Sequence, residues 1–178
     1  MTLTESQAAD FATYARNPET WVLGARRQLA VAELLFDRVA ALRSQASKFF
    51  EEFSGCYYGS FMHAGFAVEN AVKAVLVFRD PTIVLSNGKL DGKKLGPKGG
   101  HGLHALVGSV LSGLTNEDQD LLLKLEEHVI WAGRYTVPMK AVVLYDNAVM
   151  NVLRLSPADE RARLKTLIDR LLAQVGNA

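Results

Sequence analysis

Apolar residues recur at three- and four-residue steps between positions 21 and 42, with charged residues at the positions between them. This spacing predicts a long amphipathic helix, because residues three and four apart lie on one face of an α-helix. Asn17, Pro18 and Glu19 form a typical helix start, with a capping side chain, an early proline and an acid near the positive end of the helix dipole. The apolar stripe consists of Trp21, Ala25, Leu29, Ala32, Phe36, Val39 and Leu42.

The segment from Tyr57 to Phe78 has a different pattern, because its apolar residues surround nearly the whole circumference of a helix. A helix with so narrow a polar edge is expected at the centre of a bundle. We expect it to end near Asp80 and Pro81, since proline does not continue a helix.

Three further helices are expected in the second half of the chain. An apolar stripe over residues 103–111 predicts a short helix that ends near Gly113. Thr115 and Asp118 have the spacing of a capping box and predict the start of the next helix. Residues 156–176 predict the last helix, with a serine and a proline at its start, one apolar face and a glycine at its end.

The connection over residues 82–100 has no helical pattern and holds five glycines, Pro97 and four lysines against one acid, Asp91. Asn87 and Gly88 are expected to turn a small hairpin within it. A connection of this length is uncommon and is usually functional or mobile. It is therefore either a lid over a site or a solvated linker.

These elements predict an all-α protein, an up-and-down bundle of five or six helices in a single domain over residues 1–178. The stretch 137–155 fits either a buried helix or a strand. Twenty basic and nineteen acidic residues give a formal charge of +1, which excludes a general nucleic-acid coat protein and makes any anion site a local one. The single cysteine, Cys56, excludes a disulfide framework and a cysteine-rich zinc module.

The expected location is the cytoplasm. Residues 1–16 lack the basic start and apolar stretch of a secretory signal, and a lone cysteine fits a reducing compartment. Glu69, Lys73 and Arg79 interrupt the most apolar region, so we expect a soluble protein with no membrane partner.

Glu69 and Lys73 lie one turn apart on the helix that is expected to be buried. Because an unpaired buried charge is costly, they should either pair with each other or line a cleft in which Lys73 neutralises a phosphate. His101 and His104, three residues apart, could share a helix face as metal ligands do. With no second cysteine and no acid at fixed spacing, we expect neither a metal site nor a cofactor.

The end of the fourth helix carries a further set of groups suited to a nucleotide. Arg134 could bind a phosphate, and Trp131 or Tyr135 could stack on a base. The alternative is structural, with Arg134 at the negative end of a helix and the aromatic rings in the core. No phosphate loop, Ser-His-Asp arrangement or carboxylate pair is present, so the residues alone do not predict an enzyme.

Three segments in the same order resemble HEPN domains over residues 20–138. Residues 56–60, 64–69 and 73–74 resemble the second core helix of that family, with its A-G-[YF]-A-V-E-x-x-x-K-A run. His101-Gly102-Leu103 with Leu106 resembles the H-x-L-x-x-L start of the third helix, and residues 131–135 resemble the A-R-Y-P ending after the fourth.

The resemblance implies a helical bundle that commonly forms homodimers, found in toxin–antitoxin and antiviral systems as an RNase or as the partner of a small nucleotidyltransferase. The RNase branch has an arginine four to six residues before a histidine, a spacing that none of the four histidines shows, and Thr136 replaces the expected proline. We therefore expect a non-catalytic domain that binds a nucleotide or RNA phosphate or docks a nucleotidyltransferase. The expected binding residues are Glu69, Lys73, His101, Arg134 and Tyr135.

Two alternatives stay open. One is a metal-independent RNase in which His101 or His128 is the general base and Arg134 stabilises the phosphate. The other is a purely structural dimerisation module whose interface uses the amphipathic stripe that begins at Trp21.

Overall fold

The computed structural model describes residues 4–95, 101–132 and 157–176. Within these residues the chain is helical, and Val84 and Leu90 form an isolated β-bridge. The all-α prediction and the number of helices are confirmed for the described residues, whereas the ambiguous stretch 137–155 lies outside them. The six α-helices are α1 (Glu5–Arg16), α2 (Pro18–Leu42), α3 (Phe50–Arg79), α4 (Leu103–Val110), α5 (Asn116–Glu127) and α8 (Pro157–Gly176), with 3₁₀ turns at Arg43–Gln45 and Pro81–Ile83 and a π turn at His128–Ala132.

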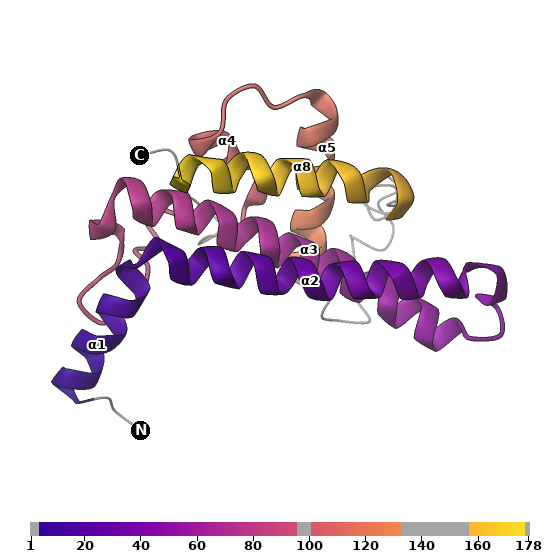
Figure 1. Ribbon diagram of the computed structural model, residues 1–178, viewed down its shortest axis with the longest axis horizontal. Coiled ribbons are helices and arrows are strands. Elements are labelled where there is room, and N and C mark those ends of the chain that lie inside the picture. The colour runs from indigo at the N-terminus through magenta and orange to yellow at the C-terminus, as the bar shows by residue number, and fades with distance from the viewer. Residues whose placement is uncertain (1–3, 96–100, 133–156, 177–178) are drawn as a thin grey trace.

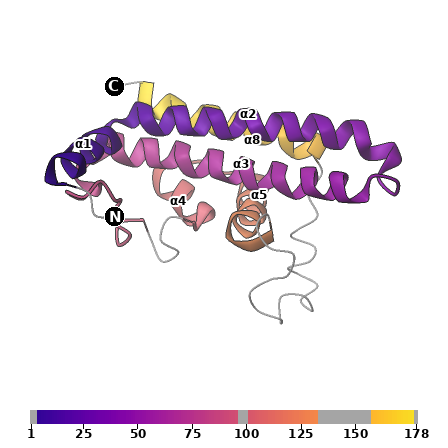
Figure 2. The same ribbon diagram turned by 90° about the horizontal axis from the view of Figure 1, so that it is seen from below.

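The helices are arranged around α3. Helices α2 and α3 form a long antiparallel pair (Figure 1), and α8 lies with α2 on one side of α3 (Figure 2). Helices α4 and α5 pack against the other side of α3 (Figure 2). Helix α3 is therefore covered from both sides, as its nearly continuous apolar pattern predicts.

Helix α2 begins as the sequence predicts, because the Asn17 side chain accepts a hydrogen bond from the Glu19 backbone N–H at 3.0 Å. Its apolar stripe packs against α3, with Ala25, Ala32 and Phe36 in the core. In this structure the chain itself covers these side chains, and a homodimer that uses this helix stays a prediction.

Helix α3 ends at Arg79 as predicted but begins at Phe50, seven residues before the predicted start. By length and composition α3 could cross a membrane, yet 61% of its most apolar window is buried inside this bundle. Burial of this extent is typical of the central helix of a helical bundle.

Gly65 allows α3 to approach the end of α5 closely. A Cβ atom at this position would lie 2.3 Å from Val129 Cγ2 and 3.2 Å from the Leu125 carbonyl oxygen. Only glycine leaves room for this contact without displacing a neighbouring side chain or the backbone.

The predicted turn at Asn87 and Gly88 is confirmed. Gly88 has a φ of +78°, and its backbone N–H donates to the Leu85 carbonyl oxygen at 2.9 Å. The ring of Phe11 in α1 packs against this glycine. The side chains of Ile83, Val84 and Leu95 anchor residues 82–95 in the core, so a lid movement of this part would have to withdraw them.

Helix α1 was not predicted, although its start carries a recognisable signal. Thr4 and Gln7 form a reciprocal capping box, in which the Gln7 N–H donates to Thr4 Oγ1 at 3.2 Å and the Thr4 N–H donates to Gln7 Oε1 at 3.0 Å. The equivalent box of Thr115 and Asp118, which was predicted, caps α5.

Helix α8 is held to the bundle by an apolar face and by one arginine. Arg161 donates to Glu33 and to Asp37 of α2, the latter at 2.7 Å, and these contacts raise the pKa of its guanidinium. The predicted apolar face is confirmed, because its leucine and isoleucine side chains are buried. These residues are Leu164, Leu167, Ile168 and Leu171.

Candidate functional site

Three of the predicted site residues form one hydrogen-bonded cluster, which we call the Glu69 cluster: Glu69, Lys73 and His101. Lys73 Nζ lies 2.5 Å from Glu69 Oε1, and His101 Nδ1 lies 2.9 Å from Glu69 Oε2. The Glu69 side chain is buried and the Lys73 side chain is partly buried, whereas the His101 side chain is 45% exposed. The sequence-based expectation that Glu69 and Lys73 pair is confirmed.

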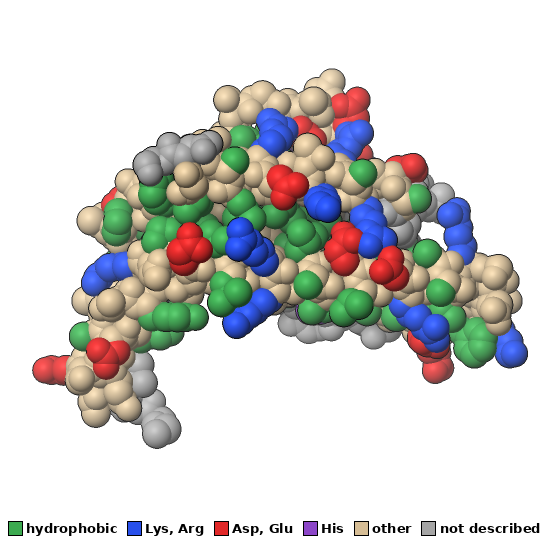
Figure 3. Space-filling model, in the orientation of Figure 1, with side chains coloured by type: hydrophobic (Ala, Val, Ile, Leu, Met, Phe, Trp, Pro, Cys, Tyr) green, Lys and Arg blue, Asp and Glu red, His purple; other side chains and the backbone are tan. Residues whose placement is uncertain are grey.

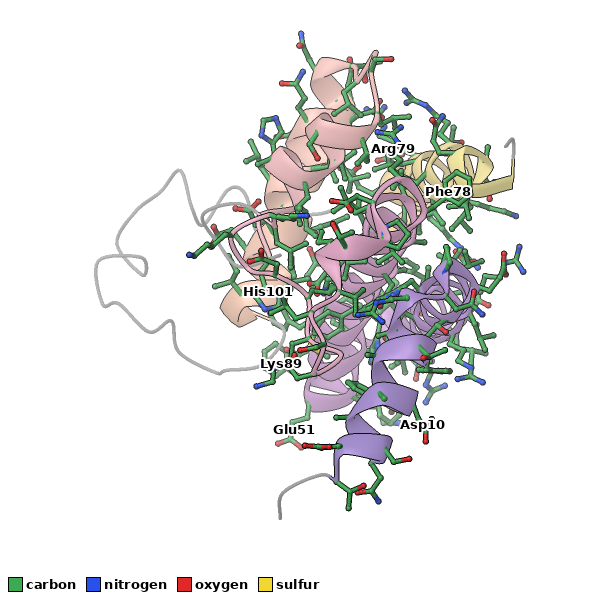
Figure 4. The ribbon with its side chains drawn as sticks, turned by 90° about the vertical axis from the view of Figure 1, so that its left-hand side faces the viewer. Asp10, Glu51, Phe78, Arg79, Lys89 and His101 are labelled. Carbon is green, nitrogen blue, oxygen red and sulfur yellow. The ribbon has the colours of Figure 1, made fainter. Side chains whose placement is uncertain are left out.

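Local sequence explains why these groups meet. Glu69 and Lys73 are four residues apart in α3, the spacing that places two side chains on one helix face. His101 precedes α4 by two residues, and Gly102 next to it is buried. The close packing of this entry against α3 brings the imidazole to the carboxylate. In Figure 4 His101 lies on the opposite side of the bundle from α8.

Trp21 completes the surroundings of Lys73. The ammonium lies 5.5 Å from the centre of the indole ring, a cation–π distance, while Trp21 Nε1 donates to the Ala15 carbonyl oxygen at 2.8 Å. Sequence analysis assigns Trp21 only to the apolar stripe of its helix, because nothing in its local pattern links it to a residue in another helix. Lys73 is therefore engaged by a carboxylate and an aromatic face and is not a free cation for a phosphate.

The partner of His101 determines where its proton lies. A carboxylate only accepts hydrogen bonds, so His101 Nδ1 carries the proton in the contact with Glu69. In the neutral ring Nε2 then holds a lone pair, and in the charged ring Nε2 becomes a second donor. No described residue forms a hydrogen bond with Nε2, which lies on the edge of the ring away from the carboxylate.

The other histidines do not join this cluster. His63 Nδ1 lies 2.6 Å from Gln28 Oε1, and burial lowers the pKa of this imidazole. The backbone N–H of His104 donates to Glu126 Oε2 at 3.3 Å. His101 and His104 do not share a face of α4, because His101 lies before this helix. Among the described residues no group of three His, Cys, Asp or Glu side chains could hold a metal ion.

His128 is fully buried in the π turn after α5. Its ring centre lies 5.9 Å from that of Tyr58 and 5.3 Å from that of Phe61. Neither ring nitrogen has a hydrogen-bond partner in the part of the chain that the structure describes. Burial lowers the pKa of His128 to about 4. The His128 ring is therefore not exposed to a ligand such as RNA in this conformation.

The lysines of the 82–95 connection have different surroundings. Lys94 Nζ donates to Asp80 Oδ2 at 2.7 Å, and this contact, together with hydrogen bonds from Thr82, lowers the pKa of Asp80 to about 2. Lys89 and Lys93 are exposed. Part of the positive charge of this connection is thus already balanced.

The remaining predicted site residues, Arg134 and Tyr135, lie outside the described residues, as does the side chain of Trp131. The structure therefore brings together Glu69, Lys73 and His101. Comparison of the chain with family models, with curated proteins and with solved structures finds no match in any of the three.

Proposed function

We propose that this protein is a HEPN-like helical domain that binds the phosphate of a nucleotide or of single-stranded RNA at the Glu69 cluster. The observation that supports this most is the half-exposed imidazole of His101, which a buried carboxylate holds through Nδ1. A ring held in this way offers Nε2 to a ligand without losing further side-chain freedom.

The charge of the cluster suits a phosphate when His101 is protonated. Glu69 and Lys73 balance each other, so the charged imidazole gives the cluster a net charge of +1. A charged imidazole that donates to a phosphate oxygen forms a charge-assisted hydrogen bond. Lys73 then acts indirectly, because its contact with Glu69 Oε1 holds the carboxylate in place.

The test measures binding of adenosine monophosphate and of a labelled single-stranded RNA by calorimetry and fluorescence anisotropy. His101→Ala should weaken binding by about tenfold, as expected for loss of one charge-assisted hydrogen bond. His104→Ala removes a neighbouring histidine outside the cluster and should leave affinity unchanged. Arg134→Ala tests whether Arg134, which the sequence analysis predicts to bind a phosphate, contributes to binding of the same ligand. Equal affinity of the wild type and His101→Ala would refute the proposal.

The pairing of Glu69 and His101 also favours a second candidate, RNA cleavage. With Nδ1 protonated, Nε2 of the neutral ring could remove the proton from a ribose 2′-hydroxyl. The oxygen would attack the adjacent phosphorus, and the bond to the 5′ oxygen would break as that oxygen takes a proton from solvent water. The products would be a 2′,3′-cyclic phosphate and a 5′-hydroxyl.

The same RNA distinguishes the two candidates. Cleavage that disappears in His101→Ala supports the enzyme, whereas RNA that is bound but stays intact supports the binding domain. Cleavage that persists in His101→Ala rejects His101 as the base. Docking of a small nucleotidyltransferase and pairing of two copies of the chain stay predictions.

A further inference from the structure

A hollow of about 260 Å³ lies between α2 and α8. Its walls come from Arg26, Leu29, Ala30 and Glu33 of α2 and Lys165 of α8. Figure 3 shows this face of the molecule, with apolar side chains between the two helices and charged side chains along both helices. None of the residues that line the hollow belongs to the Glu69 cluster.

The packing of the bundle explains why the hollow exists. Helices α2 and α8 both lie along α3 and contact it more extensively than they contact each other. Arg161 joins α8 to Glu33 and Asp37, one turn of α8 before Lys165. The small side chain of Ala30 leaves the space beside this contact unfilled.

The charged residues around the hollow differ in whether they have an ion-pair partner. The Glu33 carboxylate is engaged by Arg161, whose Nε donates to Glu33 Oε2 at 2.6 Å. Arg26 and Lys165 form no ion pair or hydrogen bond within the described part of the chain. The hollow therefore has two uncompensated cations at its rim, while Leu29 and Ala30 provide an apolar wall.

We propose that this hollow binds a small amphipathic anion. A carboxylate or phosphate head group would lie between Arg26 and Lys165, where charge-assisted hydrogen bonds can form from both sides. A short apolar body would lie against Leu29 and Ala30 and lose its contact with water. The volume is slightly below the roughly 300–1,000 Å³ of drug-sized sites, which restricts the ligand to a small one.

The test compares three probes with the same six-carbon apolar body: heptanoate, hexyl phosphate and hexanol. Binding is followed by chemical shifts of backbone amides in the full chain. The amides of residues 26–33 and 161–169 should shift, and both anions should bind at least about tenfold more tightly than hexanol, the effect of one charge-assisted hydrogen bond. The tighter anion identifies the head group. Equal binding of all three probes, or shifts confined to other residues, would overturn the proposal.

Variants separate the head-group contacts from the apolar wall. Arg26→Gln and Lys165→Gln should each weaken binding of the anions by about tenfold and leave hexanol unchanged. Ala30→Trp should fill the hollow and abolish binding of all three probes while both cations remain. Arg27→Gln is the matched control, because Arg27 is the next residue in α2 and does not line the hollow. Wild-type affinity for the anions in Arg26→Gln and Lys165→Gln would refute the assignment.

Discussion

Glu69 Oε2 lies 2.9 Å from His101 Nδ1, so a buried carboxylate in α3 is hydrogen-bonded to a half-exposed imidazole at the entry to α4. The other oxygen of Glu69 contacts Lys73. Each carboxylate oxygen thus has a partner, which is the condition under which a folded protein tolerates a buried charge. The Glu69–His101 contact links the buried centre of the bundle to His101, the residue that we propose binds the ligand.

Breaking the Glu69–Lys73 pair should destabilise the fold. Glu69→Leu and Lys73→Met should each lower the free energy of unfolding by about 3 kcal/mol, because either change removes the ion-pair partner of a largely buried charge. The double variant should lose less than the sum, since an apolar pair needs no counter-charge. Urea unfolding of the four proteins measures the coupling, and additive losses would contradict it.

His128 should make stability depend on pH. Its pKa is about 4 in the folded protein against 6.5 for an unperturbed imidazole, so the unfolded chain binds more protons between these values. The free energy of unfolding should therefore fall as pH decreases from about 6.5 to about 4, by about 3 kcal/mol in total. His128→Phe should remove this component of the pH dependence in urea titrations.

One control variant and one further measurement make this experiment specific to His128. The partly buried His104 serves as control, since His104→Gln should retain the wild-type pH dependence. His128→Phe should also be at least as stable as the wild type at neutral pH, because it removes buried nitrogens that lack hydrogen-bond partners among the described residues. An unchanged pH profile in His128→Phe would show that another group controls the effect.

Two glycines of α3 should respond oppositely to alanine. Gly65→Ala places a methyl group 2.3 Å from Val129 Cγ2, and overpacking of this kind costs about 1–3 kcal/mol. A methyl group at Gly55 meets no atom within 4 Å, so Gly55→Ala should stabilise the helix by about 0.5–1 kcal/mol. Thermal and urea unfolding give both values, and a neutral Gly65→Ala would contradict the close packing.

Much of the fold can be predicted from the sequence because its signals are local. The stripe that begins at Trp21, the cap at Asn17 and the turn at Gly88 depend on residues within a few positions of one another. The capping box of Thr4 and Gln7 is equally local and could have predicted α1. Periodicity and capping therefore determined the positions of the helices.

The candidate sites could be predicted only in part from the sequence. Glu69 and Lys73 could be paired in advance, because four residues span one helical turn. The contacts of His101 with Glu69, of Trp21 with Lys73 and of Arg161 with Glu33 link residues far apart in the chain. The hollow between α2 and α8 likewise brings together residues that are far apart in the chain. The sequence by itself determined which faces are apolar, and only the tertiary structure decided which polar groups meet, because that depends on how separate helices pack together.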